Sequence, residues 1–172
     1  MAHKVLNNIS LKDVASSGLS KIKTDLLVLV INKNTKSDSS FKEINKISKN
    51  YISKTISSHL KDAGSNVLLP KIDGIAAANI LLVNGLDSSA PTHKWLSMYQ
   101  SIAHKGNSLK CKDMSIMPGN TCPTKKDEFW LIDMVAKTIE SNVYIFSETK
   151  NKTASRPTVK KLTILTSGLT PS

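Results

Sequence analysis

The sequence has 172 residues, a hydrophobic content of 40% and a formal net charge of +11. This length suits one domain with a sizeable core, so residues 1–172 are expected to form a single domain. No apolar run approaches the ~18 residues that a bilayer-spanning helix needs. Residues 1–20 also contain no apolar segment and cleavage site of the kind found in secretory signals. We therefore expect a cytoplasmic protein without membrane contact.

The positive charge comes almost entirely from lysine, because Arg156 is the one Arg among the 24 basic residues. Sites that recognise bases, or that bind a phosphate through two parallel hydrogen bonds, favour Arg over Lys. Ser, Ile and Asn are also abundant, which is typical of codon bias in an AT-rich genome. The net charge still favours contact with a polyanion. A Lys-rich module that binds nucleic acid is therefore kept as the alternative to codon bias.

The first predicted elements are two strands. Residues 3–9 are predicted to form a short strand. Leu26–Ile31 is an unbroken apolar run without the alternation of a half-exposed strand. Such a run predicts an inner strand that is covered on both faces.

One long helix is predicted to follow, from Ser40 to the turn at Gly64. Ser40 and Glu43 have the spacing of a capping box, and Gly64 is a natural helix stop. An apolar stripe at helical spacing is predicted to face the core. It consists of Phe41, Ile44, Ile47, Tyr51, Ile52, Ile56 and Leu60.

Two strands come next, at residues 66–72 and 78–86, and the turn residues between them predict a hairpin. Pro70 indicates that the first of these strands lies at an edge of the sheet or ends there. A second helix is predicted to begin at Pro91 and to end at Gly106. Its buried side is predicted to contain Trp95, Met98, Tyr99, Ile102 and Ala103.

The last part of the chain is predicted to contain a strand at 113–119, a third helix, a polar loop at 151–157 and a final strand at 159–167. Thr124 and Asp127 have the spacing of a second capping box. Leu131, Val135, Ile139 and Val143 recur every four residues along the third helix. The order β-β-α-β-β-α-β-α-β predicts an α/β protein with three α/β/α layers around a mixed central sheet.

The residues themselves point to no active site. His93 and His104 are expected on one helix face about 16 Å apart, too far to share a metal ion. Cys111 and Cys122 lack the spacing of a zinc site, and two reduced thiols are favoured over a disulfide. The sequence has no glycine-rich phosphate loop, no serine nucleophile elbow and no convergent carboxylates. No catalytic, cofactor-binding or metal-binding residue is assigned.

Four short motifs resemble one family. Ile47, Ser48, Tyr51 and Ile52 match the helix of the amino-terminal domain of leucyl aminopeptidases, and the strand 80–86, with Gly85 near its end, is similar to the strand that follows in the family. "VYIFSETKNK" (143–152) and "LTILTSG" (162–168) resemble the family's helix end and the strand leading to its catalytic domain. The resemblance covers roughly residues 22–168, and its weakest part is roughly 90–122.

The resemblance implies a macro-like fold and a metal-dependent parent enzyme. Family members release amino-terminal residues from peptides with two divalent ions, zinc with manganese or magnesium, and form homohexamers; some bacterial members also bind DNA. The family's metal-binding signature, N-T-D-A-E-G-R, does not occur in this sequence. We therefore expect a non-catalytic amino-terminal domain whose partner is its own carboxy-terminal catalytic domain. A macro-like module for ADP-ribose is a further alternative, but the glycine-rich loops of macro domains are missing.

Overall fold

A mixed sheet of six strands forms the centre of the protein, in the order β1-β6-β5-β2-β4-β3. The computed structural model describes residues 8–15, 17–33, 35, 38–143 and 158–167. The strands are β1 (Asn8–Asp13), β2 (Leu26–Ile31), β3 (Asn66–Leu69), β4 (Asn79–Asn84), β5 (Asp113–Met117) and β6 (Lys161–Thr166). Neighbouring strands are parallel except for β3, which runs antiparallel to β4.

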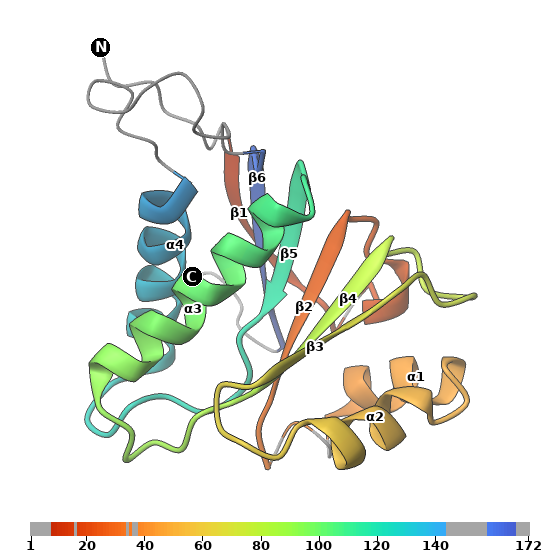
Figure 1. Ribbon diagram of the computed structural model, residues 1–172, viewed down its shortest axis with the longest axis horizontal. Helices are drawn as coiled ribbons and strands as arrows, with labels where there is room; N and C mark the ends of the chain where they lie inside the picture. Colours follow the sequence, from red (N-terminus) through yellow and green to blue (C-terminus); the bar gives the residue numbers. More distant parts are fainter. Residues whose placement is uncertain (1–7, 16, 34, 36–37, 144–157, 168–172) are drawn as a thin grey trace.

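Helices cover both faces of this sheet (Figure 1). The helices are the 3-10 turn η1 (Leu19–Lys21), α1 (Ser39–Ile47), α2 (Tyr51–His59), α3 (Thr92–Ser108) and α4 (Glu128–Val143). Leu26, Val28 and Val30 of β2 pack with α3 and α4, whereas Leu27 and Leu29 pack with α1 and α2. All six residues of β2 are buried. The predicted three-layer α/β/α fold and the inner position of this strand are confirmed.

The predicted hairpin and edge are also confirmed, because β3 lies at an edge of the sheet and its last residue precedes Pro70. The predicted strand at 3–9 lies mostly outside the described residues, and the described strand begins at Asn8. The predicted loop at 151–157 lies wholly outside them. His93 and His104 are exposed, and both cysteines are free thiols.

The prediction of one continuous helix from Ser40 to Gly64 is wrong. The chain breaks between α1 and α2, where Lys49 and Asn50 have positive φ angles of 51° and 63°. The Asn45 Oδ1 accepts a hydrogen bond from the backbone N–H of Ser53 at 3.0 Å, and its Nδ2 donates to the Asn50 Oδ1 at 2.9 Å. Short polar side chains compete in this way with helical backbone bonds. The break turns Tyr51 outward, and this residue of the predicted apolar stripe is 49% exposed.

Both predicted capping boxes are replaced by an aspartate cap. Helix α1 begins at Ser39, and the Asp38 Oδ1 accepts from the N–H of Ser40 at 2.7 Å. Helix α4 begins at Glu128, and the Asp127 Oδ1 accepts from the N–H of Trp130 at 2.8 Å. An ionised carboxylate is a strong acceptor at a helix start. The predicted partners bond elsewhere, Glu43 to the Ser20 Oγ and the Thr124 Oγ1 to the Ser88 carbonyl.

Gly106 does not end α3, as the sequence predicted, but lies buried inside it. A Cβ atom at this position would lie 2.1 Å from the Met114 Cε of β5. The missing side chain therefore allows α3 to approach the sheet. The turn after the helix is made by Lys110, with a φ of 55°. Pro91 likewise lies just before the helix, which begins at Thr92.

Candidate functional site

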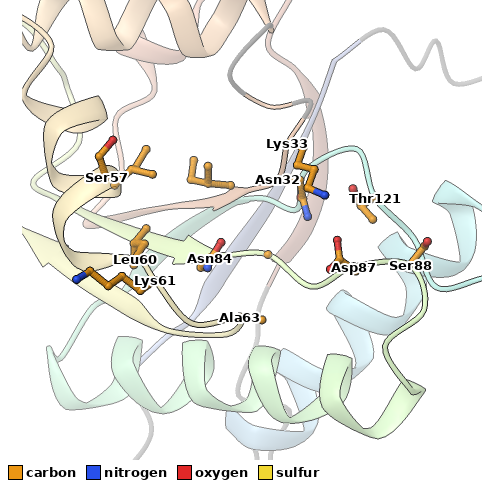
Figure 2. Close-up of a pocket in the computed structure, with 13 residues that line it drawn as sticks. Asn32, Lys33, Ser57, Leu60, Lys61, Ala63, Asn84, Asp87, Ser88 and Thr121 are labelled. Atoms are coloured by element: carbon orange, nitrogen blue, oxygen red, sulfur yellow. The ribbon is translucent and has the colours of Figure 1, made fainter.

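A cavity of about 540 Å³ opens at the carboxyl ends of β2 and β4 (Figure 2). The chain leaves β2 toward α1 and α2, whereas it leaves β4 and β5 toward α3 and α4. β2 is therefore a topological switch point, the place where open α/β sheets bind ligands. The described lining consists of Ile31, Asn32, Lys33, Ile56, Ser57, Leu60, Lys61, Ala63, Asn84, Gly85, Asp87, Ser88 and Thr121.

Four segments form the walls of the cavity, at the ends of β2, α2 and β4 and after β5, and Figure 2 shows their arrangement. Ser57, Leu60 and Lys61 come from the end of α2 and the residues just after it. Asp87 and Ser88 follow β4 and lie across from them, on the side of Thr121. The charged groups of the described lining are the ammonium groups of Lys33 and Lys61 and the carboxylate of Asp87. This set suits a polar ligand with negative charge.

Asn32 is the residue at the centre of this site. Its Nδ2 donates to the Leu86 carbonyl at 3.2 Å, and its backbone N–H donates to the Thr35 Oγ1 at 2.9 Å. Among the described residues, its Oδ1 is buried and has no hydrogen-bond partner. Leaving a buried acceptor unpaired costs about 1–3 kcal/mol. The Oδ1 lies on the side of Gly119 and the Nδ2 on the side of Gly85, which lines the cavity, so the unpaired oxygen would meet a bound N–H or O–H group only after the side chain turns.

The Asn32 side chain fits between two glycines, where any larger residue would collide with it. A Cβ at Gly85 would lie 2.3 Å from the Asn32 Nδ2, and a Cβ at Gly119 would lie 2.4 Å from the Asn32 Oδ1. Gly119 also has a φ of +79°, which ordinary residues rarely adopt. The carboxyl ends of β4 and β5 are therefore shaped around one side chain at the end of β2.

This packing predicts a specific cost for Gly119→Ala. We expect the free energy of unfolding to fall by about 2–4 kcal/mol, because the new methyl group adds a collision with Asn32 to a strained φ. Gly64→Ala is the matched control, because Gly64 has a φ of +80° and a methyl group there would meet no other side chain within 4 Å. Its loss should stay near about 1–2 kcal/mol. Urea denaturation measures both values, and equal losses would contradict the crowding around Asn32.

A second, smaller cavity lies beside the β5–α4 loop. Its volume is about 230 Å³, and its lining includes Cys122 and Glu128. Burial raises the pKa of the Cys122 thiol above its ordinary value, and Glu128 and Asp127 raise it further. The thiol is therefore protonated near neutral pH, which makes it a weak nucleophile. Burial also raises the pKa of Tyr99, whose hydroxyl donates to the Pro118 carbonyl at 3.5 Å.

No metal centre is found within the described residues, where no group of three or more His, Cys, Asp or Glu side chains could hold an ion. No described helix is long and apolar enough to cross a membrane.

The sequence did not predict Asn32 and Gly119 as site residues. The signal for Asn32 was its position directly after the buried strand Leu26–Ile31. Of the resemblance motifs, Gly85 lies at the site, whereas Ile47, Ser48, Tyr51 and Ile52 belong to α1, α2 and the break between them.

The fold is similar to those of several solved structures, although no protein-family model and no curated protein matches this sequence. A mutant of tomato leucine aminopeptidase has a TM-score of 0.68 and 19% identity; the match covers 99% of this chain and 34% of that one. The chain thus spans about a third of the length of that aminopeptidase.

Macro domains have the same fold. A Trypanosoma brucei macrodomain in complex with ADP-ribose has a TM-score of 0.63 and 10% identity, over 95% of this chain and 66% of that chain. The macrodomain of Mycobacterium tuberculosis DarG has a TM-score of 0.58 and 12% identity, over 91% of this chain and 96% of that chain. The chain therefore has a macro-domain fold, which it shares with about a third of a leucine aminopeptidase, as the sequence resemblance led us to expect.

Proposed function

We propose that this chain is the non-catalytic domain of a metal-dependent leucyl aminopeptidase. The observation that carries the proposal is the match to tomato leucine aminopeptidase, which takes in 99% of this chain but only 34% of that one. The remaining length of such a protein would contain the catalytic domain. The 19% identity of this match exceeds the 10% of the Trypanosoma brucei macrodomain.

The proposal divides the work between two parts of one polypeptide. Two divalent ions, zinc with manganese or magnesium, would lie in the catalytic domain and activate the water that attacks the peptide carbonyl. The described residues of this chain form an α/β domain around the central sheet, and no group of three or more His, Cys, Asp or Glu side chains among them could hold an ion. Assembly into a homohexamer in the cytoplasm, with peptides as substrates, completes the proposal.

The test is an aminopeptidase assay on two polypeptides from the same reading frame. With manganese present, residues 1–172 should not hydrolyse a leucine amide substrate, whereas the longer polypeptide should. The longer polypeptide treated with a chelator is the control for metal dependence. Hydrolysis by residues 1–172 alone, or none by the longer polypeptide after metal loading, would refute the proposal.

A second candidate function is ligand binding in the cavity around Asn32, and the observation that favours it is the place of this cavity at the carboxyl ends of β2 and β4, with the ammonium groups of Lys33 and Lys61 in its lining. One similar macrodomain is described in complex with ADP-ribose, which makes this compound the first one to test. A ligand that binds only the folded state raises the melting temperature. ADP-ribose at millimolar concentration should do so for the native chain and less for Asn32→Ala. An unchanged melting temperature of the native chain would end this candidate.

The Lys-rich surface favours nucleic acid as a further partner. Between Lys42 and Lys61 five exposed ammonium groups accompany one carboxylate, that of Glu43; they belong to Lys42, Lys46, Lys49, Lys54 and Lys61. If nucleic acid binds through such a surface, the logarithm of the affinity should fall linearly as the logarithm of the salt concentration rises. An electrophoretic shift assay with duplex DNA measures this slope. If no DNA binding is detected, or if the affinity does not depend on salt concentration, nucleic acid is ruled out as a partner.

A further inference from the structure

The two edges of the sheet differ in how well they are protected. β3 has four residues and is followed by Pro70, which cannot extend a hydrogen-bonded edge. β1 has six residues without proline, and in the described residues it pairs with β6 alone. Its two large apolar side chains are exposed, Ile9 to 39% and Leu11 to 54%. A long edge strand that exposes apolar side chains is a site for pairing with another strand.

The backbone of β1 presents defined groups to such a partner. The N–H of Val14 donates to the Thr166 carbonyl of β6 at 2.9 Å. Backbone groups alternate between the two sides of a strand. The N–H and C=O groups of Ser10 and Lys12 therefore face β6, and those of Ile9 and Leu11 face outward. The outward backbone groups thus belong to the same two residues that expose apolar side chains.

We propose that β1 pairs antiparallel with β1 of a second copy of this chain, around a twofold axis at Ser10. Ile9 then lies opposite Leu11 of the other copy in both halves of the interface, and their outward N–H and C=O groups form four hydrogen bonds. Lys12 lies opposite Asn8. A shift of two residues would instead place Leu11 opposite Leu11 and Ile9 opposite Asp13 of the other copy, which leaves one apolar pair in place of two. The two sheets become one continuous sheet.

A second copy fits this edge because Ile9 and Leu11 are two residues apart, so a twofold axis at Ser10 brings each exposed apolar side chain opposite the other in both halves of the interface. Ile9 and Leu11 are in register with Leu162 and Ile164 of β6, which belong to the core under α3 and α4. The four apolar side chains at the axis therefore extend that core across the interface. The net charge of +11 on each copy opposes association. Dimerisation is accordingly stronger at high salt, where this repulsion is screened.

Sedimentation of the full chain over a range of concentrations tests the dimer. We expect a monomer–dimer equilibrium whose dissociation constant falls as salt rises. Leu11→Lys should weaken the dimer by about tenfold or more. Leu96→Lys is the matched control, because Leu96 is an exposed leucine on α3 (37% exposed) that should leave the dimer intact. A monomer at every concentration, or a dimer that Leu11→Lys does not weaken, would overturn the proposal.

Cysteine cross-linking tests the register. Ser10→Cys places two thiols opposite each other across the axis, within reach of a disulfide, whereas Lys12→Cys faces Asn8 of the other copy. Under mild oxidation Ser10→Cys should give a covalent dimer, and Lys12→Cys should give no more than the native chain. The native chain sets the background from Cys111 and Cys122. Equal cross-linking of the two variants would refute this pairing.

Discussion

Leu27→Ala is expected to lower the free energy of unfolding by about 2–5 kcal/mol. Leu27 is fully buried in β2, the strand that pairs with both β4 and β5. Its side chain packs in the core under α1 and α2, where Ile44 and Ile52 are also fully buried. Removing three carbons there costs their transfer free energy and leaves a cavity that a close-packed layer cannot fill. Urea denaturation, followed by circular dichroism, measures the loss.

The same substitution at an exposed leucine is the control. At low protein concentration and low salt, where the chain is a monomer, Leu11→Ala on β1 should change the free energy of unfolding by no more than about 0.5 kcal/mol, because Leu11 is 54% exposed. The comparison holds the chemistry constant and changes only the position in the sheet. Similar losses for the two variants would contradict the assignment of β2 to the centre and β1 to the edge.

Trp95→Ala is expected to cost about 3–5 kcal/mol. Trp95 lies in the core under α3 and is fully buried. Its Nε1 donates to the Ala90 carbonyl at 3.2 Å, which ties the start of α3 to the loop before it. Trp95→Phe keeps most of the apolar volume and loses this hydrogen bond, so it should cost less than Trp95→Ala. Denaturant unfolding ranks the two variants.

Trp130→Ala provides the control for this prediction. Trp130 is only half-buried on α4, and the Lys126 Nζ lies 5.3 Å from the centre of its ring. An exposed cation–π contact contributes about 0.5–1 kcal/mol. The loss for Trp130→Ala should therefore stay well below that for Trp95→Ala. A reversed order would contradict the packing of α3 against the sheet.

The strands were largely predictable from the sequence, because apolar runs record burial directly. Leu26–Ile31 has no alternation, and the structure covers it on both faces. The antiparallel pair β3–β4 followed from turn residues and Pro70. These signals are local, because each strand can be recognised from its own residues and the turn beside it, without knowledge of the rest of the chain.

Helix ends and the site were not predictable in the same way. The break at Lys49 and Asn50 depends on side-chain bonds of Asn45 that compete with a continuing apolar stripe. Gly106 resembles a stop signal in sequence, but it is needed for the close approach of α3 to β5. Asn32 becomes notable only when β4 and β5 bring Gly85 and Gly119 to its two sides. Such contacts join residues far apart in sequence, and no local pattern records them.

The proposed role as one domain of a larger aminopeptidase is tested most directly by sequencing the gene beyond the codon for Ser172. We predict that the reading frame continues into a second domain with clustered acidic metal ligands, of the N-T-D-A-E-G-R type. A stop codon directly after Ser172, or a continuation without such a cluster, would contradict the proposal.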